Sequence, residues 1–118
     1  MTPKHILLIE DSNAIADIVC ALLEEQNYKV THIPHQPVET LAAFNCHLIV
    51  LDEWLNARQS HMYCLEIKAL RDLQHIPVII FSTALDIEEI RSRCGADGSV
   101  RKPFDVDELI NEVRRCCP

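Results

Sequence analysis

The chain has 118 residues, enough for one domain with one hydrophobic core, and its 48% hydrophobic and 25% charged residues are ordinary for such a domain. Its 11 Lys and Arg against 18 Asp and Glu give a formal net charge of −7, which disfavours nucleic acid or an anionic membrane as the main partner. Residues 1–5 lack the layout of a signal peptide, and no apolar run approaches the ~18 residues that span a bilayer, so we expect a cytoplasmic protein.

The cysteines do not form a metal-binding pattern. They stand at positions 20, 46, 64, 94, 116 and 117, without a C-x-x-C pair. We therefore interpret them as free thiols, several of them acting as small hydrophobic residues in helices and strands. Cys46-His47 is an alternative ligand pair, but a loop entering a strand is the favoured interpretation.

The first half of the chain alternates strands with helical segments. Segments 5–9 (HILLI) and 48–51 (LIVL) are short apolar runs without alternation, typical of strands buried on both faces. In segment 28–33 apolar and polar residues alternate weakly, which suits a strand at the edge of a sheet. Apolar residues between these strands recur at helical spacing. The predicted buried stripes are Ile15, Ile18, Val19, Leu22 and Leu23, and, after Pro37, Val38 with Leu41.

The second half continues this alternation. Segment 78–81 (VIIF) is predicted to be a third buried strand, and the short segment 99–101 suits the other edge of the sheet. Asp86 with Glu89, and Asp105 with Glu108, have capping-box spacing, and Gly95 stands where a helix should end. The predicted helical stripes are Met62, Leu65, Ala69, Leu70 and Leu73; Ile87, Ile90 and Cys94; and Leu109, Ile110 and Val113.

Strands and helices thus alternate five times. Parallel neighbouring strands need crossover connections, and right-handed crossovers through helices cover both faces of the sheet. We therefore predict an α/β domain with a doubly wound, five-stranded parallel sheet and five helices. In such a sheet the ligand site lies beyond the carboxyl ends of the central strands, where the strand order reverses.

Chemically active side chains follow four of the predicted strands. They are Glu10-Asp11, Asp52-Glu53, Ser82-Thr83 and Lys102-Pro103. Clustered carboxylates repel one another unless a cation is present, and hard oxygen ligands favour Mg²⁺. A hydroxyl and an ammonium can hold phosphate oxygens, so the set indicates phosphoryl transfer to, or beside, an aspartate.

Each of these residues also has a purely structural explanation. An acid after a strand often caps the next helix, and Asp11 or Ser12 suits a helix that starts near Asn13. A Lys-Pro pair is usually only a turn. The conjunction at four strand ends favours one shared site.

Together these residues resemble the receiver domain of response regulators, the phosphorylatable module of bacterial two-component signalling, including its chemotaxis regulators. The likeness rests on Glu10-Asp11, Asp52, Ser82 and Lys102-Pro103-Phe104, and on the stretches IPVIIFSTA (76–84) and GADGSVRKPF (95–104). It implies a flavodoxin-like sheet with strand order 2-1-3-4-5. Residues 1–118 would form a single receiver domain with no effector domain after Pro118, either a stand-alone regulator or a piece of a longer chain.

By this resemblance, Asp52 accepts a phosphoryl group from a sensor histidine kinase, a phosphotransfer protein or a small donor such as acetyl phosphate. Mg²⁺ would be bound by the carboxylates of Asp11 and Asp52 and by the backbone carbonyl of Trp54, with Glu10 acting through water. The only chemistry expected is self-phosphorylation and self-dephosphorylation of an aspartate, so the chain is a switch rather than an enzyme.

The resemblance also implies that Ser82 and Lys102 hold phosphoryl oxygens and that the Lys102-Pro103 bond is cis. The added charge would bias a surface formed by the fourth helix, the fifth strand and the fifth helix. Output would be a changed affinity for a downstream protein, without direct nucleic-acid or membrane binding. Dimerisation through the same surface is common in the family and stays open here.

The chain departs from the family pattern around the site. Ser99 stands where the family usually has an aromatic residue, which puts the coupled movement of hydroxyl and aromatic side chains in doubt. Asn56 and Ser60 replace a proline and a glycine that shape the loop after the phosphoacceptor, so we expect that loop to differ. Trp54 is large enough to overhang the site, and we hypothesise that it shields an acyl phosphate from water.

Two other functions remain as alternatives. A pseudo-receiver would keep the acids but signal by protein contact without phosphorylation, and Ser99 and the altered loop favour it. A flavodoxin-like binder or hydrolase is disfavoured, because residues 10–13 (EDSN) place negative charge where nucleotide-binding loops offer glycine-rich backbone N–H groups.

Overall fold

The computed structural model describes residues 2–55 and 58–118, and for residues 54, 55 and 58 it describes the backbone only. Its main feature is a five-stranded parallel sheet in the order β2-β1-β3-β6-β7, which confirms the predicted order 2-1-3-4-5. The strands are β1 His5–Ile9, β2 Lys29–Ile33, β3 Leu48–Leu51, β6 Val78–Ser82 and β7 Gly98–Arg101. The predicted buried strands are central, and the two weaker ones lie at the edges.

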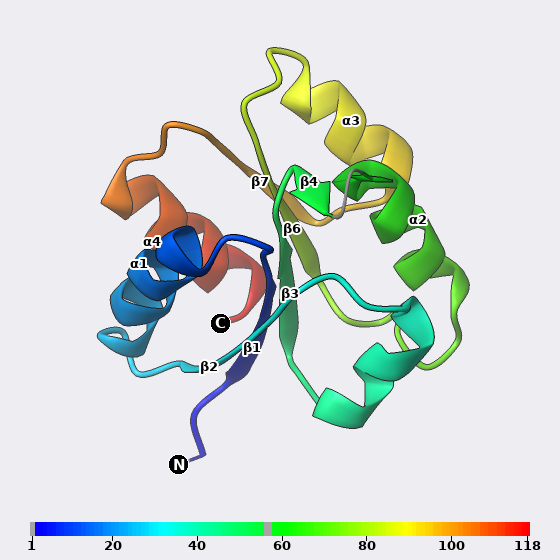
Figure 1. The fold of residues 1–118 in the computed structure, drawn as a ribbon. Helices are drawn as coiled ribbons and strands as arrows, with labels where there is room; N and C mark the ends of the chain where they lie inside the picture. The colour runs from blue at the N-terminus through cyan, green and yellow to red at the C-terminus, as the bar shows by residue number, and fades with distance from the viewer. Residues whose placement is uncertain (1, 56–57) are drawn as a thin grey trace.

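Helical segments cover both faces of the sheet (Figure 1). They are α1 Asn13–Glu24, the 3₁₀ helix η1 Val38–Phe44, α2 Ser60–Ala69, α3 Ile87–Cys94 and α4 Val106–Cys116. Helices α1 and α4 lie on one face, and η1, α2 and α3 lie on the other. The prediction of five helices is confirmed, with the second as a 3₁₀ helix.

A hydrophobic core lies on each face of the sheet, between the strands and the helices that cover that face. Successive side chains of a strand point to opposite faces, so Ile6 and Val50 pack under α1 and α4, whereas Leu7 and Ile49 pack under the other layer. All four side chains are fully buried. Burial on both faces explains why these strands read as unbroken apolar runs.

The buried face of α1 differs from the predicted stripe. Ile18 is 59% exposed and Ile15 is 37% exposed, whereas Ala16, Val19 and Leu23 are fully buried. A helix approaches a sheet most closely through small side chains, and Ala16 takes that position. The larger Ile side chains are displaced to the rim.

The predicted stripe of α2 is wrong at Met62 and Leu65, whereas Leu70 and Leu73 pack into the core from beyond the end of the helix. Met62 and Leu65 are each 49% exposed, and the residues that face the sheet are Ser60, Tyr63, Cys64 and Ile67. The helix ends at Ala69, because Leu70 already has extended backbone angles. The apolar residues beyond it belong to the turns before β6.

The helix caps agree with the sequence in part. The Ser12 hydroxyl accepts from the Ile15 N–H at 3.4 Å. The Asp105 side chain accepts from the Asp107 N–H at 3.2 Å, and not from the Glu108 N–H as a capping box requires. Within the described chain, Asp86 makes no side-chain capping bond at the start of α3. The capping boxes predicted at Asp86 and Asp105 are therefore not formed as such.

Gly95 ends α3 as predicted, with a left-handed φ of 76°. A Cβ there would meet the Lys68 Cγ at 3.7 Å, an ordinary contact, so the only penalty for a side chain is backbone strain. We expect Gly95→Ala to lower the free energy of unfolding by about 1 kcal/mol in urea denaturation. Gly95→Asn should lose less, because Asn tolerates this conformation. An alanine variant as stable as the wild type would contradict the expectation.

The cysteines are free thiols in the structure, as the sequence analysis interpreted them. All six cysteines are free thiols, and the His47 Nδ1 accepts a hydrogen bond from the His5 N–H at 2.9 Å. Cys46-His47 therefore leads into β3, as expected, with the imidazole engaged by the neighbouring strand. No described helix is both long and apolar enough to cross a bilayer.

Candidate functional site

The strand register brings the predicted site residues to one edge of the sheet. Ile9 pairs with Leu51, and Leu51 pairs with Ile80, so Glu10 and Asp52 lie level with Phe81, the residue before Ser82. The pairing continues past the strand ends, with the Asp52 N–H donating to the Ile9 carbonyl at 3.1 Å. Chains from three central strands thus deliver their polar side chains to the same place.

Asp52 and Lys102 meet at this edge. The Lys102 Nζ donates to the Asp52 Oδ1 in an ion pair, and Asp52 is only 8% exposed. The Lys102 N–H donates to the Ser82 carbonyl at 2.8 Å, which fixes the lysine backbone against β6. The Lys102-Pro103 bond is cis, as the resemblance implied.

Glu10 lies beside this pair and is almost completely buried, with 2% exposed. Its Oε1 accepts from the Ser12 N–H at 3.0 Å, but its buried Oε2 has no hydrogen-bond partner among the described residues. Burial raises the pKa of Glu10 to about 7; the Ser12 N–H opposes this rise, the Asp52 charge adds to it, and the Lys102 charge opposes it. A buried carboxylate oxygen without a donor fits a site that takes a cation and its water.

Asp11 is exposed, and its Oδ1 accepts from the His35 N–H at 2.8 Å. This bond ties the carboxylate to the loop between β2 and η1. In the described ranges, no cluster of three or more His, Cys, Asp or Glu side chains has the geometry of a metal site. The predicted arrangement needs only two direct carboxylates, because a backbone carbonyl and waters supply the other ligands.

The loop after Asp52 forms a short antiparallel ribbon of β4 Trp54–Leu55 and β5 Arg58–Gln59, in which Trp54 pairs with Gln59. Ser60, which stands at the family's glycine position, is buried and starts α2. The expectation that this loop differs from that of the family stays a prediction. The Trp54 side chain and Asn56 lie outside the described part, so the shielding hypothesis stays untested.

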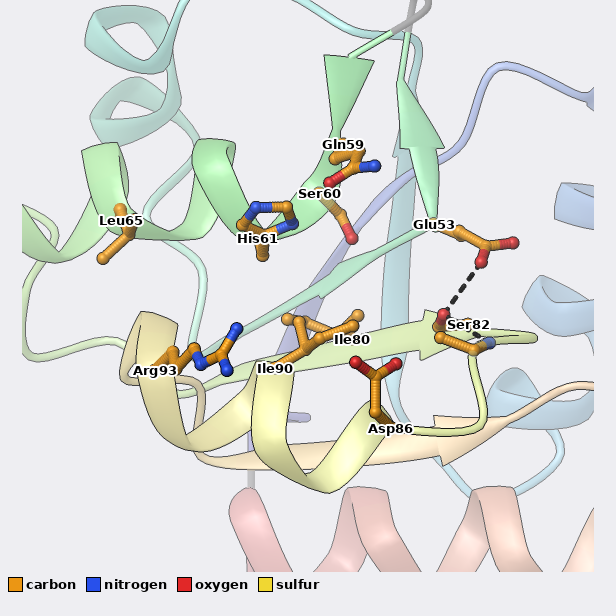
Figure 2. A pocket seen from close by; sticks show the side chains of 11 residues that line it. Glu53, Gln59, Ser60, His61, Leu65, Ile80, Ser82, Asp86, Ile90 and Arg93 are labelled. Atoms are coloured by element: carbon orange, nitrogen blue, oxygen red, sulfur yellow. Dashed lines mark hydrogen bonds between the residues drawn. The ribbon is translucent and has the colours of Figure 1, made fainter.

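The structure places Ser82 with Glu53, a partner that the sequence reasoning missed. The Ser82 Oγ donates to the Glu53 Oε1 at 2.9 Å, and Thr83 Oγ1 lies 3.1 and 3.0 Å from the two Glu53 oxygens. Figure 2 shows the Glu53 side chain pointing toward Ser82 at the rim of a cavity between α2 and α3. An acid directly after Asp52 and two adjacent hydroxyls at the end of β6 were the only signals in the sequence.

Ser99 forms a polar bridge where the family usually has an aromatic side chain. Its Oγ donates to the Glu88 Oε1 at 2.7 Å, and its N–H donates to the Glu112 Oε2 at 2.8 Å. The Ser99 hydrogen bond lowers the pKa of Glu88, with help from Arg91. The bridge connects α3, β7 and α4, which correspond to the predicted fourth helix, fifth strand and fifth helix.

The fold and the edge residues define a doubly wound α/β domain with an acidic site at the carboxyl ends of its central strands. The sequence profile of the response regulator receiver domain matches residues 6–114. The chain therefore belongs to the response regulator receiver domain family, a family of signalling modules, as the resemblance indicated.

Relatives support this membership. The sensory transduction protein RegX3 of Mycobacterium tuberculosis is 31% identical over 115 residues, which cover 92% of this chain and 48% of RegX3. The transcriptional regulatory protein CseB of Streptomyces coelicolor is 29% identical over 114 residues, which cover 93% of this chain and 47% of CseB. The chain thus spans about half the length of these relatives.

Solved structures share the fold. The receiver domain of the sensor histidine kinase PA1611 from Pseudomonas aeruginosa, which has magnesium coordinated in its active-site cleft, aligns with a TM-score of 0.84 at 24% identity over 98% of both chains. The signal receiver domain of a histidine kinase from Syntrophus aciditrophicus aligns with a TM-score of 0.80 at 27% identity, over 97% of this chain and 89% of that one.

Proposed function

We propose that the chain is a phosphorylation-dependent signalling switch in which Asp52 accepts a phosphoryl group from a histidine kinase or phosphotransfer protein in the cytoplasm. The observation that carries this proposal is the buried Asp52 carboxylate, paired with Lys102 beside Glu10 at the sheet edge. In the transfer, an Asp52 oxygen bonds to phosphorus as the bond from phosphorus to the donor imidazole breaks. Lys102 then shifts from the carboxylate to a phosphoryl oxygen.

A magnesium ion belongs to this proposal. Asp11, Asp52 and the Trp54 carbonyl would hold it, with Glu10 acting through water, and the unpartnered Glu10 Oε2 supports a cation there. The ion would neutralise phosphoryl charge during transfer and during hydrolysis. Magnesium in the cleft of the PA1611 receiver domain, and the Mn²⁺-bound form of the response regulator Rcp1, support the same assignment.

Output would pass through the surface of α3, β7 and α4. The Ser99 bridge joins these three elements through Glu88 and Glu112. A phosphoryl group that draws Lys102 and Ser82 inward would pull on β7 and on the β6–α3 loop, and thereby change the affinity for a downstream protein or for a second copy of the chain.

The pseudo-receiver is the second candidate, and one observation favours it. The Ser82 hydroxyl, which would hold a phosphoryl oxygen, already donates to Glu53. A chain with this arrangement could signal by protein contact alone. Phosphoryl acceptance at Asp52 separates the two candidates.

We expect the chain in Mg²⁺ to bind beryllofluoride, a phosphoryl mimic, in a saturable calorimetric titration, and to gain one phosphoryl mass with acetyl phosphate. Asp52→Asn should abolish both responses, because it removes the nucleophilic carboxylate. Asp72→Asn, which changes an exposed acid in the turns after α2, is the matched control and should respond like the wild type. The absence of any response in the wild type and the control would favour the pseudo-receiver.

A further inference from the structure

The single hydroxyl proton of Ser82 is already engaged in the structure. The residue is 3% exposed, and its Oγ donates to the Glu53 Oε1 at 2.9 Å while it accepts from the Ala84 N–H at 3.0 Å. A hydroxyl has a single proton to donate. Ser82 therefore cannot donate to a phosphoryl oxygen on Asp52 while it donates to Glu53.

Glu53 is held in place by its backbone and by a second hydroxyl. Its carbonyl accepts from the Ser60 N–H at 3.0 Å at the base of the β4–β5 ribbon, and its carboxylate contacts Thr83 Oγ1 as well as Ser82. Hydrogen bonds to a carboxylate are about twice as strong as neutral ones. The contact between Glu53 and Ser82 is thus a specific arrangement of a partly buried site.

Glu53 also borders an open cavity. Glu53 lines a cavity of about 570 Å³ between α2 and α3, which His61 and Arg93 also line (Figure 2). A carboxylate that leaves Ser82 can turn into this open space, which is lined by polar groups and by charged groups of both signs. The cavity therefore offers room for the Glu53 side chain to move without a rearrangement of the sheet.

We propose that Glu53 is a positioning residue that competes with the phosphoryl group on Asp52 for the Ser82 hydroxyl. In the unphosphorylated chain Glu53 holds the hydroxyl, and after phosphoryl transfer the phosphoryl oxygen takes the hydroxyl while Glu53 turns into the cavity. The exchange replaces one charge-assisted hydrogen bond by another, so Ser82 stabilises the phosphorylated state less than it would beside an apolar residue. This inference rests on the proposed function of Asp52.

A double-mutant cycle with beryllofluoride and Mg²⁺ tests the competition. Glu53→Gln keeps the shape of the side chain but weakens its acceptor, and we expect it to lower the Kd for beryllofluoride about tenfold. Ser82→Ala removes the contested proton. In the Ser82→Ala background, Glu53→Gln should lower the Kd less than about threefold, because only the charge effect is left.

Asp86→Asn is the matched control, because Asp86 lines the same cavity and the substitution removes one negative charge, as Glu53→Gln does. It should lower the Kd less than about threefold in both backgrounds. Thermal unfolding of each variant without ligand reports any loss of the fold separately from ligand affinity.

The outcomes separate this inference from the proposed function. Binding by the wild type that Glu53→Gln does not tighten, or tightens equally with and without Ser82, would overturn the competition and leave the phosphoacceptor intact. Tightening that depends on Ser82 supports it. If neither the wild type nor Glu53→Gln binds, both the inference and the phosphoacceptor function fail.

Discussion

Replacing Lys102 by Met is expected to lower the free energy of unfolding of the metal-free protein by about 3 kcal/mol at pH 8. The lysine is the cation that pairs with Asp52, and the two side chains are only 20% and 11% exposed. Without it, no ammonium compensates the two neighbouring carboxylates of Asp52 and Glu10. The loss should shrink as the pH falls toward 7, because Lys102 lowers the pKa of Glu10 and its removal lets Glu10 take up a proton at a higher pH.

Mg²⁺ should reverse part of this loss. If Asp52 binds Mg²⁺ as proposed, the ammonium and the metal would compete for its carboxylate in the wild type, because Lys102 Nζ already donates to its Oδ1. Lys102→Met removes that competitor, so we expect Mg²⁺ to bind the variant more tightly and to stabilise it more than the wild type. Urea denaturation with and without Mg²⁺ measures both effects.

Lys68 offers a matched control. Its side chain is equally exposed, at 20%, and its Nζ donates to Asp97 and to the Ile76 carbonyl at 2.9 Å, on the opposite side of the sheet from α1 and α4. Lys68→Met should also destabilise the protein, but Mg²⁺ should stabilise it no more than it does the wild type. Equal Mg²⁺ effects in both lysine variants would show that Lys102 does not compete with the metal.

The sequence predicted the sheet well because burial on both faces leaves a direct signature. Short apolar runs without a polar face, such as Leu48 to Leu51, predicted central strands, and the structure confirms them. The helix faces were harder, because α1 offers two apolar sides. Hydrophobicity favours Ile18, whereas close packing favours Ala16, and periodicity alone does not weigh the two.

The site was predictable to the extent that it depends on strand ends. Asp52 and Lys102 meet because their strands end at the same edge. The hydrogen bond between Glu53 and Ser82 depends on the ribbon after Asp52, whose two-residue strands carry almost no sequence signal. The bond from the His35 N–H to Asp11 likewise depends on the path of a loop.

Glu10→Gln is expected to raise the free energy of unfolding of the metal-free protein by about 2 kcal/mol at pH 8. The folded-state pKa of Glu10 is raised to about 7 from an ordinary value of 4.5, mainly by burial. A raised pKa means that the folded protein binds this proton more tightly than the unfolded chain does. Glu10 therefore lowers stability as the pH rises from about 4.5 to 7, and its cost is constant above that.

The glutamine variant should lose this pH dependence, so its advantage over the wild type should fade between pH 7 and pH 5. Its neutral amide can donate toward the neighbouring Asp52, whereas the ionised wild-type Oε2 finds no donor among the described residues. Mg²⁺ should narrow the difference at pH 8, because a cation relieves the charge that makes Glu10 costly. A variant that gains the same stability at pH 5 and pH 8 would mean that packing, and not the buried charge, sets the contribution of Glu10.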